Sequence, residues 1–86
     1  MILRFTKKAE KDLLKINRED ALRIKNKINQ YIKTPLGVDI TKLEGYPDYY
    51  RIRQGNYRIV FTVLGNEIKI MQILSIKHRR EVYKDL

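Results

Sequence analysis

The sequence predicts an α+β domain of order βααβββ, in which an N-terminal helical hairpin packs on one face of an antiparallel sheet. Three observations support this fold class. Apolar residues recur at helical spacing before Pro35, alternation with a period of two begins after Pro47, and Gly-Asn pairs separate the alternating segments. Because helical and strand patterns are segregated along the chain, the helices are expected to lie together on one face of the sheet.

The first elements are a short strand and a helix. The apolar segment Ile2–Phe5 is the strand candidate. Thr6 then suits the N-cap of a helix that extends to Ile16, with Ala9 and Leu13 at helical spacing.

A second helix follows directly. Asn17 suits its N-cap, with Asp20 three residues later, and the helix is expected to end near Lys33 because Thr34-Pro35 disfavours helical backbone. Its apolar stripe comprises Ala21, Ile24, Ile28, Tyr31 and Ile32. The lysines and arginines on the outer faces of both helices are expected to be solvated.

The segment from Thr34 to Pro47 shows little periodicity and is expected to be a loop, with Leu43 as its main anchor to the core. After it, Gly55-Asn56 and Gly65-Asn66 each suit a two-residue hairpin turn of type I′ or II′.

Closing the first hairpin on Gly55-Asn56 fixes a register. It places Arg53 opposite Arg58, with Ile52–Ile59, Arg51–Val60 and Tyr50–Phe61 as the following pairs. Since side chains alternate between faces, the helix-facing set is Tyr50, Ile52, Ile59, Phe61 and Val63. Arg51, Arg53 and Arg58 emerge together on the opposite face.

The last strand is expected over residues 67–76. Continued alternation puts Ile68, Ile70 and Leu74 on the helix side, and Lys69, Met71, Ile73 and Ser75 on the arginine face. Gln72 then points into the core, which either a bulge or a partner contact would explain. The basic tail KHRREVYKDL follows, with a helical turn expected over Arg79–Lys84.

Composition indicates a single domain over residues 1–86 in a soluble, cytoplasmic protein. The chain has no cysteine, no signal-peptide pattern and no apolar run long enough to span a membrane. Its net charge of +9 predicts attraction to a polyanion or an acidic protein, although many basic proteins are simply soluble.

The opposed arginines indicate an anion site. Like charges directly across a strand pair cost a fraction of a kcal/mol to about 1 kcal/mol. The planar guanidinium of arginine grips phosphate with two hydrogen bonds, so phosphate binding would account for the arrangement. The alternative is a solvated sheet edge whose arginines splay apart into water.

The segments KLEGYPDYYRIRQGNYRIVF and ILSIKHRREVY closely resemble the RelE/ParE superfamily of toxins from type II toxin–antitoxin systems, over essentially the whole chain. Arg79 and Tyr83 of the tail resemble the RelE branch, whose fold is similar to that of microbial ribonucleases. The resemblance implies a toxin that enters the ribosomal A site and cuts mRNA by attack of the ribose 2′-hydroxyl on the phosphodiester.

The resemblance also implies site roles. Arg58 matches the arginine that binds the scissile phosphate, Arg79 the arginine that stabilises the transition state or protonates the leaving oxygen, and Tyr83 the tyrosine that stacks on or orients a nucleotide. Arg51 and Arg53 stand where relatives can carry lysines, one of them a candidate base, and this departure leaves the base in question.

Arginine stays protonated in proteins, so another side chain must accept the proton. The candidates are His78, the only histidine, together with Lys77 and Tyr83. An exposed tail histidine and a tyrosine that merely anchors the tail are the plainer alternatives. Lys77 and Arg80 are further phosphate-binding candidates, and no metal or other cofactor is expected because ligand clusters are lacking.

Tyr46 and Tyr49 are candidate nucleic-acid contacts, whereas Tyr50 and Tyr57 are expected to face the core. The partners implied are a cognate acidic antitoxin, the ribosome and mRNA. Two other functions stay open: a ParE-like toxin that inhibits DNA gyrase without a nuclease site, and a plain nucleic-acid-binding module.

Overall fold

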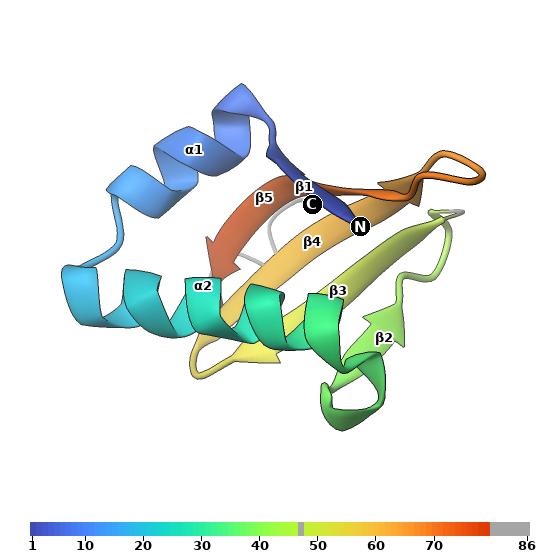
Figure 1. Cartoon of the computed structure of the whole chain (residues 1–86). Coiled ribbons are helices and arrows are strands. Elements are labelled where there is room, and N and C mark those ends of the chain that lie inside the picture. The colour runs from blue at the N-terminus through green and yellow to red at the C-terminus, as the bar shows by residue number, and fades with distance from the viewer. Residues whose placement is uncertain (47, 80–86) are drawn as a thin grey trace.

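A computed structural model describes residues 1–46 and 48–79 of the chain. It contains two α-helices, one short 3₁₀ helix and five strands, and the two helices lie on one face of the sheet (Figure 1). The elements in chain order are β1 (Ile2–Phe5), α1 (Lys7–Leu14), α2 (Arg18–Lys33), η1 (Pro35–Gly37), β2 (Ile40–Lys42), β3 (Tyr49–Gln54), β4 (Tyr57–Leu64) and β5 (Ile70–His78).

The sheet has the order β1-β5-β4-β3-β2 and is mixed rather than fully antiparallel. The three pairings among β2, β3, β4 and β5 are antiparallel, but β1 pairs with β5 in parallel. Sequence alternation cannot reveal this contact, because the two strands lie at opposite ends of the described chain. The predicted α+β class and the helices on one face are confirmed.

Both predicted helix caps are present. The Thr6 side chain accepts a hydrogen bond from the Ala9 amide at 3.1 Å, and the Asn17 side chain accepts one from the Asp20 amide at 2.9 Å. Asn17 also donates to the Asp20 carboxylate. Each cap satisfies an amide that the first turn of a helix leaves without an intrahelical partner.

The segment predicted to be a loop contains a short edge strand. β2 pairs with β3 through Ile40 opposite Ile52, and Val38 and Ile40 pack against the core. Leu43, expected to be the anchor, is only half-buried, although its amide donates to the Tyr49 carbonyl. Three residues are too few to show an alternating pattern, which is why the sequence did not reveal this strand.

The first hairpin has the predicted register, from Arg53 opposite Arg58 to Tyr50 opposite Phe61. The second turn differs. Leu64 pairs with Ile70, so a longer loop over residues 65–69 replaces the two-residue turn expected at Gly65-Asn66. Gly65 has φ +93°, and a Cβ there would lie 2.1 Å from the Ile68 carbonyl oxygen, so the loop requires glycine at this position.

A bulge in β5 explains the mismatch at Gln72. Val60 pairs with Ser75 but Phe61 pairs with Ile73, which leaves Leu74 as an extra residue. The alternation therefore changes phase, and Gln72 lies on the helix-free face.

Because of the bulge and the longer loop, several side chains of this region do not lie where the alternation predicted. Met71 and Ile73, predicted to share the arginine face, are fully buried in the core. Ile70, predicted to face the helices, pairs with Leu64 on the helix-free side, and Ile68 lies in the loop with 67% of its surface exposed. Ser75 lies on the arginine face, as predicted.

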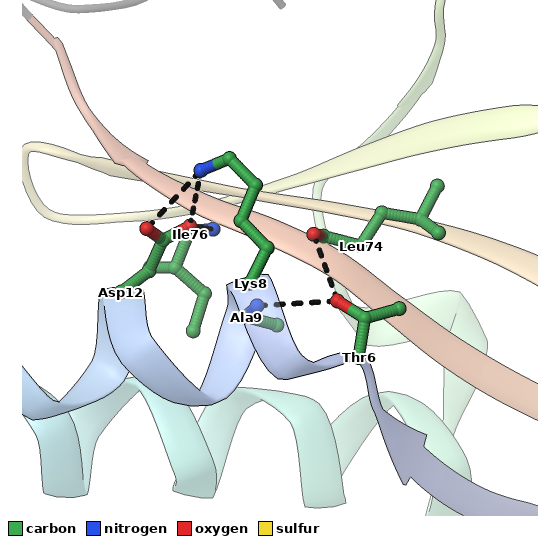
Figure 2. Close-up of polar contacts among 6 residues, drawn as sticks. All are labelled: Thr6, Lys8, Ala9, Asp12, Leu74 and Ile76. Carbon is green, nitrogen blue, oxygen red and sulfur yellow. Dashed lines mark hydrogen bonds and ion pairs between the residues drawn. The ribbon is translucent and has the colours of Figure 1, made fainter.

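Side chains of α1 and of its N-cap residue form hydrogen bonds with the backbone of β5 around the bulge (Figure 2). The Thr6 hydroxyl donates to the Leu74 carbonyl at 3.1 Å, and the Asp12 carboxylate accepts from the Ile76 amide at 3.0 Å. The same carboxylate also pairs with Lys8. Two polar side chains thus hold α1 against the irregular part of β5.

The core lies between the helices and the sheet. Its fully buried members include Ala9, Ile24, Ile28, Ile52, Ile59, Phe61, Met71 and Ile73. Tyr31 contacts Phe61 with a ring-centroid distance of 5.2 Å, and burial, with a smaller contribution from Tyr50, raises the pKa of Tyr31 above its usual value of 10.0. None of the helices described combines the length and apolar character needed to cross a bilayer.

Candidate nucleic-acid interface

Three cations lie side by side on the helix-free face of the sheet. Arg53 of β3 is directly opposite Arg58 of β4, and Arg58 is directly opposite Lys77 of β5. Directly paired residues point to the same face, and two strand spacings of about 4.8 Å make this row about 10 Å wide. We call Arg53, Arg58 and Lys77 the cationic row.

The members of the row differ in burial. Arg53 is exposed and Arg58 is half-buried, whereas only 5% of the surface of Lys77 is exposed. Like charges directly opposite each other on neighbouring strands destabilise the folded state. A fold that keeps this arrangement is suited to an anion that approaches from outside the sheet.

Arg58 has a hydrogen-bond donor that no described residue accepts. Its Nε is buried and lacks a hydrogen-bond partner among the described residues. A buried donor without a partner costs about 1–3 kcal/mol, and a guanidinium cannot remove that cost by losing its proton. An oxygen of a bound phosphate would satisfy the donor and the charge together.

The ion pairs found within residues 1–46 and 48–79 belong to the helices. They join Lys8 to Asp12 at 3.0 Å and Arg23 to Asp20 at 3.3 Å. Neither Arg53 nor Arg58 forms an ion pair with a described acidic side chain. The strand residues of β3, β4 and β5 include no aspartate or glutamate.

Arg51 lies on the same face, one row further along the strands. It is opposite Val60 of β4, which is in turn opposite Ser75 of β5. Two residues along a strand correspond to about 6.7 Å, so Arg51 extends the positive surface along β3. The predicted grouping of Arg51, Arg53 and Arg58 is therefore present.

His78 lies on the other face. It pairs with Tyr57 in the register, and their rings meet edge to face with centroids 5.3 Å apart and an interplanar angle of 89°. Lys77 precedes His78 in the chain and Arg58 follows Tyr57. Because side chains alternate along a strand, those of Lys77 and Arg58 point to the opposite side of the sheet. The structure therefore separates the imidazole from the cationic row.

Arg79 lies beside the end of this row. It is exposed, and its amide donates to the carbonyl of Asn56 in the hairpin turn, which continues the β4–β5 contact beyond His78. Arg80 and Tyr83, as well as most of the helical turn expected over Arg79–Lys84, lie outside the described residues.

The tyrosines divide as expected between core and surface. Tyr50 stacks on Phe61 at 5.6 Å and Tyr57 packs against the core, both on the helix side. Tyr46 and Tyr49 stack on each other at 6.0 Å and are exposed. Tyr49 pairs with Thr62, which places it on the face of the cationic row.

Two groups near the site were not anticipated from the sequence. Thr62 is buried on the helix-free face, and its hydroxyl donates to the carbonyl of Asp48, a residue with φ +65°. A polar hollow beside the hairpin turn is lined partly by Gln54, Asn56 and Arg23. No cluster of three His, Cys, Asp or Glu side chains that could hold a metal ion occurs among the residues the structure describes.

Comparison with known proteins gives consistent similarities. The sequence model of the family described as ParE toxin of type II toxin-antitoxin system, parDE, matches residues 3–83. Toxin RelE3 of Methanocaldococcus jannaschii is 48% identical over 48 residues, which cover 56% of this chain and 51% of that protein. The match thus spans about half the length of this relative.

Two solved structures illustrate the similarity of fold. The RelB–RelE antitoxin–toxin complex from Methanococcus jannaschii includes a chain that is 33% identical, with a TM-score of 0.73 and coverage of 94% of this chain and 95% of that one. The isolated RelE toxin of E. coli is 27% identical, with a TM-score of 0.73 and coverage of 96% and 90%.

Proposed function

This chain belongs to the ParE toxin family of type II toxin–antitoxin systems, and from that premise we propose that it is a ribosome-dependent mRNA endonuclease of the RelE kind. The observation that supports this most is the cationic row, with the buried Nε of Arg58, which lacks a partner among residues 1–46 and 48–79, at its centre. The similarity to RelE structures adds to it.

The proposed reaction needs no external nucleophile. The ribose 2′-oxygen attacks the adjacent phosphorus, the bond to the 5′-oxygen breaks, and the products are a 2′,3′-cyclic phosphate and a 5′-hydroxyl. One proton leaves the 2′-hydroxyl and one is delivered to the 5′-oxygen. Arg58 and Arg79 would bind the phosphate and stabilise the charge that develops on it, with Arg51, Arg53 and Arg80 holding neighbouring phosphates.

The proton acceptor is proposed among the non-arginine groups. Lys77 is directly opposite Arg58 on the same face, and Tyr83 matches the family's tail tyrosine. His78, the third candidate, would have to act from the opposite side of the sheet, so the geometry favours Lys77 over His78, and Tyr83 stays a candidate from the family resemblance alone.

The proposed partners follow from charge and from the relatives. RelE toxins of this fold occur in complexes with RelB antitoxins, and we infer a cognate antitoxin for this chain. Its toxin-binding segment should be acidic, because a surface with net charge +9 accelerates encounter with a negative partner. The ribosomal A site is the proposed place of action.

A second candidate function is inhibition of DNA gyrase. The observation in its favour is that the matching family model is named after ParE rather than RelE. This function would require no phosphate chemistry at the cationic row.

The deciding experiment expresses the wild type and the Arg58→Ala, Arg79→Ala double variant, and maps the 5′ ends of cellular mRNA. The wild type should create new 5′-hydroxyl ends inside translated regions. Loss of transition-state contacts should lower their frequency at least 100-fold in the double variant. Growth arrest with double-strand DNA breaks and no new mRNA ends would instead support the gyrase function.

A matched pair of variants tests the proton acceptor. Lys77→Arg retains the positive charge but cannot accept a proton, whereas Lys77→Met removes both properties. Equal loss of cleavage in the two variants would support Lys77 as the base. Activity retained in Lys77→Arg alone would assign it phosphate binding only and leave the step to Tyr83.

A further inference from the structure

Tyr57 and His78 form a small aromatic wall on the helix side of the sheet, at the end nearest the first hairpin turn. They are cross-strand neighbours, their rings meet edge to face at 5.3 Å, and both side chains are half-buried. Because they are not fully enclosed, part of the aromatic surface is accessible to a ligand.

Two hollows lie against this wall, and both residues line each of them. The first, of about 240 Å³, is otherwise lined by Asp20, Arg23 and residues 54–56 of the hairpin turn. The second, of about 310 Å³, is bordered by α1 and β5 through Asp12, Lys15 and Ile76. We call the first of these the turn hollow.

The turn hollow suits a planar, uncharged polar group better than a phosphate. Among the described residues that line it, Arg23 is the one arginine or lysine, and it is paired with Asp20 at 3.3 Å, so the charge of these residues is largely compensated. Gln54 and Asn56 add amide groups with both donors and acceptors. Aromatic surface beside amide and carboxylate groups is the combination that binds unpaired bases of single-stranded RNA.

The turn hollow is close to the cationic row along the chain. Tyr57 immediately precedes Arg58, and the amide of Arg79 is bonded to the carbonyl of Asn56, which borders the hollow. The same end of the sheet thus presents cations on one face and an aromatic wall on the other. An RNA strand held by its phosphates at Arg58 and Arg79 could turn one base around the hairpin.

We propose that the turn hollow binds an unpaired nucleobase of the RNA, stacked on the ring of Tyr57, with the perpendicular ring of His78 against its edge and Gln54 as a hydrogen-bonding partner. The choice of RNA as the ligand rests on the proposed function. The site would recognise a nucleotide flanking the cleaved bond, which gives His78 a role in positioning rather than in proton transfer.

Binding can be followed directly because the chain contains a single histidine, whose imidazole protons give one set of NMR signals. The wild-type protein is titrated with each of the four nucleoside 5′-monophosphates, and separately with ribose 5-phosphate. We expect upfield ring-current shifts of the Tyr57 signals and a change in the His78 signals with nucleotides, and binding of ribose 5-phosphate that is weaker by about 5-fold or more. Equal shifts with ribose 5-phosphate, or none with any nucleotide up to 20 mM, would overturn the proposal.

Two glutamines provide a matched pair of variants on opposite faces. Gln54→Ala removes a hydrogen-bonding group from the turn hollow, whereas Gln72→Ala makes the same change on the helix-free face. Gln54→Ala should raise the dissociation constant of the preferred nucleotide about 3- to 10-fold, and Gln72→Ala should leave it unchanged. Equal effects of the two variants would contradict the assignment.

The readout is binding rather than cleavage, so the two proposals can fail separately. Nucleotide binding in the turn hollow without mRNA cleavage would leave the inferred subsite standing and remove the endonuclease. Cleavage without the His78 shifts would do the reverse.

Discussion

At the scale of single residues, Arg58 lowers the stability of the fold but favours the phosphate binding on which the proposed function depends. It lies between Arg53 and Lys77 in the cationic row, and its buried Nε lacks a described partner. Each of these features destabilises the folded chain, whereas each would stabilise a bound phosphate.

Replacement of Arg58 by methionine should therefore raise stability. Removal of the like-charge contacts and of a donor that has no partner in the described part of the chain predicts an increase of about 0.5–2 kcal/mol in the free energy of unfolding, at the expense of RNA cleavage. Urea denaturation at 50 mM and 500 mM NaCl measures it, and the gain should shrink at high salt because charges are screened. Arg23→Met is the control, because it removes an exposed arginine that is paired with Asp20. A loss of more than 1 kcal/mol in Arg58→Met would show that its side chain supports the fold.

At the scale of elements, β5 is held in place by side chains of α1. The Asp12 carboxylate accepts from the Ile76 amide beyond the bulge, and Thr6 donates to the bulged residue Leu74 (Figure 2). Regular β-ladders satisfy such groups by strand pairing. The last β1–β5 pair is Phe5 with Ile73, so these two contacts serve the part of β5 beyond the end of β1.

Asp12→Ala is expected to lower the free energy of unfolding by about 1–3 kcal/mol, because the Ile76 amide loses its acceptor in a partly buried place. Asp12→Asn keeps an acceptor oxygen and gives up only the exposed ion pair with Lys8, so it should cost about 1 kcal/mol or less. Chemical denaturation compares the two. Equal losses would mean that the carboxylate charge, rather than the hydrogen bond, supports β5.

The elements that were predictable from the sequence are those fixed by local contacts. The β3–β4 register and the face of its three arginines were predictable, because a tight Gly55-Asn56 turn fixes the pairing and alternation then fixes the faces. The caps at Thr6 and Asn17 are local hydrogen bonds and were predictable for the same reason.

Longer-range features could not be predicted. Gly65-Asn66 has the same letters as the first turn, yet a five-residue connection forms there, and an extra residue at Leu74 breaks the alternation of β5. The parallel contact of β1 with β5 joins distant segments, and the separation of His78 from Arg58 depends on faces that only the completed sheet defines.

At the scale of the whole molecule, a net charge of +9 on 86 residues gives a long-range field that attracts RNA without regard to sequence. The cationic row contributes to this field on the face that carries no helix. The helices add lysines and arginines on the other side, so the molecule is positive on both faces.

The salt dependence of RNA binding distinguishes docking on the cationic row from attraction by the overall positive charge. The logarithm of the association constant for a 12-nucleotide single-stranded RNA should fall linearly with the logarithm of KCl concentration, by about 0.7 per cation engaged. Arg53→Gln, an exposed member of the row, should reduce that slope by about 0.7, as measured by fluorescence anisotropy. Lys8→Gln should change it little because Lys8 is already paired with Asp12. The same reduction in both variants would mean that RNA follows overall charge and does not dock on the row.

The extra residue in β5 also affects how the cationic end of the sheet is oriented. Without Leu74, Ile73 and Ser75 would be consecutive, and the strand could become a regular ladder in which every existing pair keeps its partner and its face. The contact of Thr6 with the Leu74 carbonyl and the added local twist would be lost, and with the twist the curvature that orients Lys77 and Arg79. Shortening the chain by this one amino acid would therefore alter shape while every charge stays the same, so the direction of the guanidinium groups could be studied apart from their number.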